Sequence, residues 1–272
     1  MNSISQFKNL EPLFRKVLPI LFELLGNQPL DWLTIGKVTQ RSLNKRRERI
    51  ERTGGGIFVE TSLVDVIMGI VLEKPHAKSM YLFIKRLLEE LAQHLDDNEK
   101  TLIKDNIFGL LTNVDLKYLN HLGELCILNA IKKQLGYKLV ATEFPRVTQE
   151  KEGSKIDFRF LIDATGSYLL VEVVSLHLPI DKKLDDAAIE NILMQKIPTK
   201  LKTKGIQQRP DFYLAPILWG RKELIESFID YYEKVKPTFQ NTLIPSCFVA
   251  YHYGNDEIIH EFGSIDTILK DH

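Results

Sequence analysis

Apolar residues recur at three- and four-residue spacing through the first part of the chain, from Ser5 to about Leu119. This spacing is typical of amphipathic helices. Turn-forming residues interrupt the pattern and predict about five or six helices. The residues that set the pattern are Leu13, Val17, Ile20, Leu21 and Leu24, followed by Met80, Phe83, Ile84, Leu87, Leu88 and Leu91.

The pattern changes after about residue 120. A helix is expected from about Asn120 to Gln134, ended by Gly136 as a left-handed cap. The strands and helices expected after it are Tyr137–Glu143, Lys155–Ile162, Tyr168–Leu176, a helix over Leu184–Lys204, a strand over Phe212–Trp219, a helix over Arg221–Lys234, and a strand over Ser246–Tyr253.

This order predicts an α/β fold after an all-helical N-terminal region. We expect two domains, residues 1–119 and residues 120–272. The turn at Ala164–Ser167 predicts a hairpin between the second and third strands. The long connection to the fourth strand predicts a parallel, right-handed crossover.

The composition indicates where the protein works and which kinds of partner it can bind. The 36 basic and 36 acidic residues cancel, so any contact with nucleic acid must come from a local patch. No apolar run approaches the roughly 20 residues of a membrane span. The two distant cysteines, Cys126 and Cys247, favour reduced thiols and the cytoplasm.

Three carboxylates fall where hydrolysis of a phosphodiester would need them: Glu124 on the helix, Asp157 in the second strand and Glu172 in the third. Glu172 stands in the apolar run Leu169–Val174, where a carboxylate is costly unless it is paired, hydrogen-bonded or coordinated. A buried ion pair with a helix lysine is the structural alternative. Carboxylate oxygens favour Mg²⁺ or Mn²⁺ over zinc.

The pattern Gly123-Glu124, Lys155-Ile-Asp157-Phe158, a hairpin and Val171-Glu172-Val-Val174 resembles the PD-(D/E)xK nuclease superfamily over about residues 122–253. The resemblance implies a restriction-endonuclease-like core of helix, three strands, helix and strand. It also implies that Asp157 and Glu172 bind Mg²⁺ or Mn²⁺ and that Glu124 assists them.

Two positions depart from the family pattern. Val174 replaces the lysine that follows the glutamate, and Ile156 replaces the proline before the aspartate. Some family members carry the lysine on the next helix. The resemblance therefore points first to Lys200 and then to Lys204, out of the group Lys196, Lys200, Lys202 and Lys204.

The run Arg41–Gly56 carries six basic residues and two acids before its three glycines. Lys45, Arg46, Arg47 and Arg49 are candidate phosphate contacts, because arginine binds phosphate in a bidentate manner. A solvated helix with arginine–glutamate pairs is the equal alternative.

These observations lead to the hypothesis of a metal-dependent endonuclease that acts on nucleic acid, with DNA as the favoured substrate. A nuclease fold that has lost its chemistry and binds nucleic acid or protein is the alternative. The sequence leaves the oligomeric state open, a homodimer included.

Overall fold

The computed structural model describes residues 10–26, 28–53, 62–113, 116–145, 155–178, 184–192, 211–235, 247–254 and 257–264. The chain divides into two compact units, Met1–Leu122 and Gly123–His272. The boundary between them lies within the helix α8 (Leu116–Leu135).

Unit 1 is helical. Its described helices before α8 are α1 (Leu10–Val17), α2 (Ile20–Leu25), α3 (Trp32–Thr53), α4 (Leu63–Val71), α5 (Pro75–His94), α6 (Asp97–Leu102) and α7 (Lys104–Thr112). The described residues thus hold seven helices here, where the sequence predicted about five or six, because short helices such as α6 lack a full apolar repeat.

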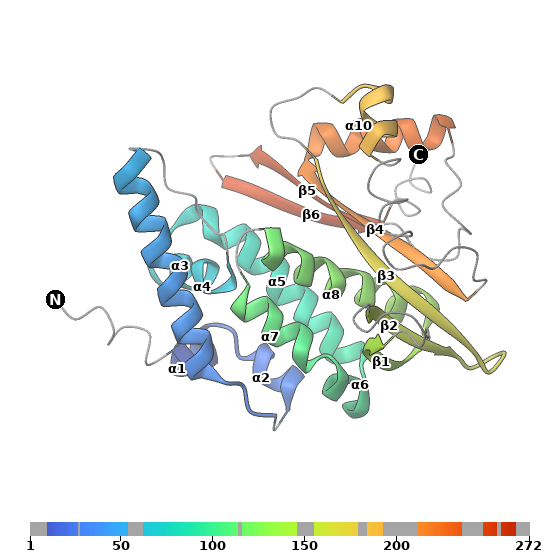
Figure 1. Cartoon of the computed structure of the whole chain (residues 1–272), viewed down its shortest axis with the longest axis horizontal. Helices are drawn as coiled ribbons and strands as arrows, with labels where there is room; N and C mark the ends of the chain where they lie inside the picture. The colour runs from blue at the N-terminus through green and yellow to red at the C-terminus, as the bar shows by residue number, and fades with distance from the viewer. Residues whose placement is uncertain are drawn as a thin grey trace. The chain divides into compact units, whose positions relative to one another are not determined.

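The predicted apolar faces form the core of unit 1, in which α5 packs against α2 and α4 (Figure 1). Leu21 and Leu24 of α2 and Ile84, Leu88 and Leu91 of α5 are buried. Helix α6 begins with a reciprocal cap: Glu99 N–H donates to Asp96 Oδ1, and Asp96 N–H donates to Glu99 Oε2, both at 2.9 Å.

Unit 2 contains a mixed sheet, and the chain is therefore a mixed α/β protein. Its strands are β1 (Lys138–Pro145), β2 (Lys155–Ile162), β3 (Ser167–His177), β4 (Phe212–Arg221), β5 (Cys247–Gly254) and β6 (Glu257–Ser264), with α10 (Lys222–Val235) between β4 and β5. They lie side by side in chain order.

Both the predicted hairpin and the predicted parallel crossover are confirmed. β1, β2 and β3 pair antiparallel, β3, β4 and β5 pair parallel, and β6 returns antiparallel to β5. The sequence missed β6. Gly136 ends α8 at a φ of 65°, as expected of a left-handed cap.

Helices cover both faces of this sheet. On one face, Val174 and Leu176 of β3 and Leu218 of β4 pack with Ile225 and Phe228 of α10. Residues 186–192, which are also helical, contribute to the same cluster. Figure 1 shows α10 along β4 and β5.

The other face receives α8. A β-carbon at Gly123 would lie 3.0 Å from Ile217 Cγ2 and 3.1 Å from Ser175 Oγ. Ser175 and Ile217 are partners in the β3–β4 ladder. Glycine thus lets α8 approach the sheet closely at this point.

Cys126 and Cys247 are buried free thiols. None of the helices in the described ranges is long and apolar enough to span a membrane.

Candidate functional site

The candidate site lies where β2 and β3 stop pairing. Their ladder runs from Ile162↔Ser167 to Phe158↔Val171, and β3 then continues beside β4 as far as His177. Asp157 is the residue before Phe158, and Glu172 is the residue after Val171. The fold therefore brings these two carboxylates to the point where two adjacent strands separate, which we call the strand fork.

Asp157 holds the strand fork by a hydrogen bond. Its Oδ2 accepts from the backbone N–H of Val173 at 2.7 Å. Leu170 N–H donates to Asp211 O, on the side of β4. Because N–H groups alternate along a strand, Val173 N–H points toward β2, beyond the last ladder pair. The Asp157 side chain thus supplies the acceptor that a backbone carbonyl supplies elsewhere.

Glu172 is completely buried, with 0% of its surface exposed. Its partner in β4 is Leu214, and alternation places its side chain on the face that carries Val174 and Leu176. A carboxylate in such surroundings has to be compensated to remain charged. The burial that the sequence implied for Glu172 is confirmed.

Glu124 is half-buried on α8. That helix packs on the face to which Ser175 and Ile217 point, whereas Glu172 alternates to the opposite face. Within the described ranges, no group of three or more His, Cys, Asp or Glu side chains is placed to hold a metal ion. A shared site of Glu124, Asp157 and Glu172 therefore stays a prediction.

The predicted replacement lysines, Lys200 and Lys204, lie outside the described residues, together with Lys196 and Lys202. Val174, which the sequence resemblance aligned with the family's lysine, is 5% exposed in the apolar cluster with α10. This position serves packing.

Lys155, the first residue of the motif that contains Asp157, lies on β2 and was not among the lysine candidates from the sequence. Lys155 Nζ is 3.6 Å from Glu143 Oε2 of β1. Glu143 lies between Thr142 and Phe144, which pair with Phe158 and Ile156, so it lies on the part of β1 that faces Asp157.

Glu143 also has a φ of 48°. Non-glycine residues rarely adopt this left-handed conformation, and such residues cluster at functional sites. No signal in the sequence could have identified Glu143, because a glutamate near a strand end is ordinary.

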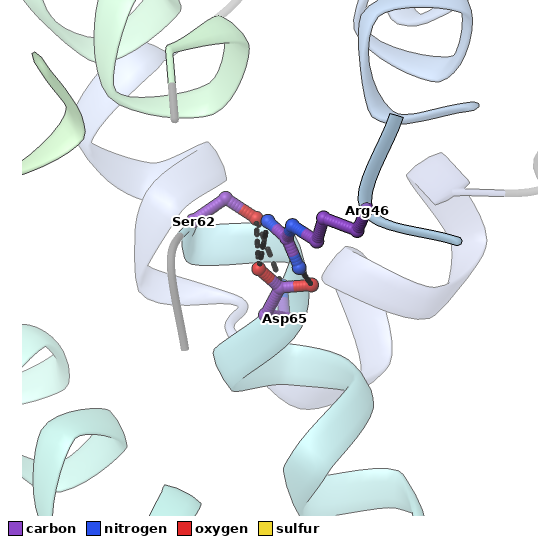
Figure 2. Close-up of polar contacts among 3 residues, drawn as sticks. All are labelled: Arg46, Ser62 and Asp65. Atoms are coloured by element: carbon purple, nitrogen blue, oxygen red, sulfur yellow. Dashed lines mark hydrogen bonds and ion pairs between the residues drawn. The ribbon is translucent and has the colours of Figure 1, made fainter. Parts of the chain in front are cut away.

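The basic run of the N-terminal region lies on α3, and one of its arginines is engaged within unit 1. Arg46 donates to both oxygens of Asp65, from Nη1 at 3.0 Å and from Nη2 at 2.8 Å (Figure 2). Ser62 caps α4 and also donates to Asp65 Oδ2 at 2.9 Å. This ion pair joins α3 to the first turn of α4, so Arg46 has a structural role.

Lys45 and Arg47 are exposed on α3, and their role as phosphate contacts stays a prediction. The side chain of Arg49, the fourth candidate, lies outside the part of the chain that the structure describes.

Comparisons of the chain with protein families, with curated proteins and with solved structures find no match.

Proposed function

We propose that unit 2 is a divalent-metal-dependent endonuclease with a restriction-endonuclease-like core, and that DNA is its substrate. The observation that carries the proposal is the strand fork, where Asp157 and a fully buried Glu172 lie on adjacent strands. The order α8, β1, β2, β3, helical residues 186–192 and β4 supports it, because it follows the order that the resemblance implied.

The two candidate ligands at the strand fork are both carboxylates. Oxygen ligands of this kind are preferred by hard cations such as Mg²⁺ and Mn²⁺, whereas thiols and imidazoles are typical ligands of softer metals. Asp157 and Glu172 would hold Mg²⁺ or Mn²⁺. The family resemblance assigns an assisting role to Glu124, but α8 packs on the sheet face opposite to Glu172, so the proposal rests on Asp157 and Glu172. A cation bound there would acidify an attacking water and neutralise charge on the phosphate.

Two of the chain's own groups would support the reaction, one by orienting a metal ligand and one by stabilising charge on the phosphate. Val173 N–H fixes the orientation of Asp157 through the bond to Oδ2. A lysine ammonium would stabilise the charge that develops on the phosphate oxygens. Lys200 and Lys204 are the candidates from the resemblance, and Lys155 is an additional candidate, two residues before Asp157 on β2.

A second function is favoured by Val174. Its burial in the apolar cluster with α10 leaves no lysine at the family position. A nuclease fold without chemistry, acting as a binding module for nucleic acid or protein, is consistent with this packing.

Cleavage of circular DNA tests the proposal. Supercoiled plasmid and circular single-stranded DNA would be incubated with the full chain and Mg²⁺ or Mn²⁺. We expect the wild type to cleave both DNAs. Cleavage by Asp157→Asn and by Glu172→Gln should be slower by at least about 100-fold, the effect of losing one group that stabilises transition-state charge. Both substitutions keep the size of the side chain.

Asp163→Asn is the matched control, because Asp163 is exposed in the β2–β3 turn of the same unit. It should cut like the wild type. Equal cutting by all four proteins would point to a contaminating nuclease and contradict the proposal. No cutting by a folded wild type with either metal would favour the binding module.

A further inference from the structure

The β2–β3 hairpin carries an exposed aromatic ring on the face of the sheet near its turn. Tyr168 of β3 is 43% exposed. It pairs with Leu161, which in turn pairs with Lys138 of β1. Residues directly opposite each other in antiparallel strands share a face. Lys138, which is exposed, therefore lies in the same row as Tyr168.

Arg159 lies in the next row of this face, opposite Leu170. Its guanidinium carbon is 3.7 Å from the centre of the Tyr168 ring. This contact is a cation–π interaction that holds the guanidinium plane and the ring together. The face thus presents a flat aromatic group and two cations from three adjacent strands.

The chemistry of this group matches one kind of occupant. Aromatic rings with neighbouring arginine stack on bases of any sequence, and lysine contacts the phosphates between them. The bases of a duplex already stack on one another inside the helix. An exposed aromatic ring can therefore form a favourable stacking contact only with an unpaired base. Since the chain carries no net charge, such a local set of cations is what nucleic-acid binding requires.

The position of this group relates it to the strand fork. Arg159 is two residues from Asp157 along β2, and Tyr168 is four residues from Glu172 along β3. At about 3.3 Å per residue these separations are roughly 7 and 13 Å. A short single strand could therefore contact both places. Figure 1 shows β2 and β3 running together toward their turn.

We infer that Lys138, Arg159 and Tyr168 form a stacking platform for single-stranded nucleic acid. The inference rests on the proposed function in one respect, since it names the form of the substrate that reaches the strand fork. Binding to the stacking platform itself requires neither a metal nor the carboxylates.

The test is binding of a fluorescently labelled oligothymidylate to the full chain, measured by anisotropy in EDTA so that no cleavage occurs. The same measurement with a labelled duplex gives the comparison. The wild type should bind the single strand more tightly than the duplex. Tyr168→Leu should weaken single-strand binding by about 5- to 100-fold, the usual effect of removing one stacking ring.

Two further variants separate stacking from folding and from general charge. Tyr168→Phe keeps the ring and should bind like the wild type. Arg159→Gln should weaken binding more than Lys117→Gln, which removes an exposed charge on α8 in unit 1. Equal binding by the wild type, Tyr168→Leu and Arg159→Gln would overturn the inference, as would a wild type that prefers the duplex.

Failure of the inference and failure of the proposed function give different results. If Asp157→Asn and Glu172→Gln bind the single strand like the wild type but no protein cleaves DNA, the stacking platform stands and the nuclease proposal falls. If the wild type cleaves and the substitutions at Tyr168 and Arg159 change neither binding nor cleavage, the nuclease proposal stands and the stacking platform falls.

Discussion

The Asp157 carboxylate serves the fold independently of any reaction, because it supplies the acceptor for Val173 N–H where the β2–β3 ladder ends. The sequence placed Asp157 in the right strand, but it could not reveal this bond. Alternation along a strand predicts which face a side chain occupies. It does not predict that a side chain turns into the plane of the sheet.

Asp157→Ala removes the acceptor and leaves a partly buried N–H without it, so unfolding in urea should become easier by about 1–3 kcal/mol. Asp157→Asn keeps an oxygen in place and should cost less. Asp163→Ala, in the exposed turn, should stay within about 0.5 kcal/mol of the wild type. Equal losses in the Ala and Asn variants of Asp157 would show that the bond to Val173 contributes little.

His260 gives the protein a pH dependence of its own. Burial lowers the pKa of His260 from 6.5 to about 4. Below pH 6.5 the unfolded chain takes up a proton at this position that the folded chain does not. The free energy of unfolding should therefore fall as the pH drops from about 6.5 to about 4, by at most about 1.4 kcal/mol per pH unit from this group.

Urea titrations at several pH values check this prediction. His260→Gln lacks the titrating group, so its stability should vary less with pH over that interval. Identical pH profiles for the two proteins would contradict it.

At the scale of elements, most strands of unit 2 followed from their apolar and β-branched runs. β2 has the predicted bounds, and β3, β4 and β5 differ from theirs by one or two residues. β6 was missed because it lies at one end of the strand order beside β5 alone, with His260 and Glu261 between its apolar residues. A strand with one neighbour and a mixed pattern gives a weak signal.

The basic helix α3 shows a second limit at this scale. Its arginines look alike in sequence, yet Arg46 meets Asp65 of α4 while Arg47 is exposed. The two partners are 19 residues apart along the chain. Which arginine is engaged depends on how the two helices pack.

The ion pair between α3 and α4 should therefore stabilise unit 1. Arg46→Ala leaves Asp65 half-buried without its guanidinium partner and should cost roughly 1–3 kcal/mol, between the values for exposed and buried pairs. Arg46→Lys should recover part of this loss, since lysine cannot bind both oxygens in the same way. The adjacent Arg47→Ala should cost at most about 0.5 kcal/mol. Similar thermal unfolding of the Arg46→Ala and Arg47→Ala variants would contradict the structural role of Arg46.

At the scale of the whole molecule, the sequence by itself determined that the chain is a mixed α/β protein with a helical first part and a sheet in the second. Apolar periodicity has a different period in helices and strands, and so it can be read locally. It also determined that Glu172 is buried, because apolar residues surround it in the chain. The sequence also determined the net charge of zero, which means that any contact with nucleic acid must come from a local patch of basic residues.

Only the tertiary structure decided which of these residues meet. It brought Asp157 and Glu172 to one strand fork, put α8 with Glu124 on the sheet face opposite to Glu172, and paired Lys155 with Glu143. It also assembled Lys138, Arg159 and Tyr168 on one face of three strands. Such groupings depend on strand register and helix packing, and these are set by contacts between residues distant in the chain, which local patterns do not encode.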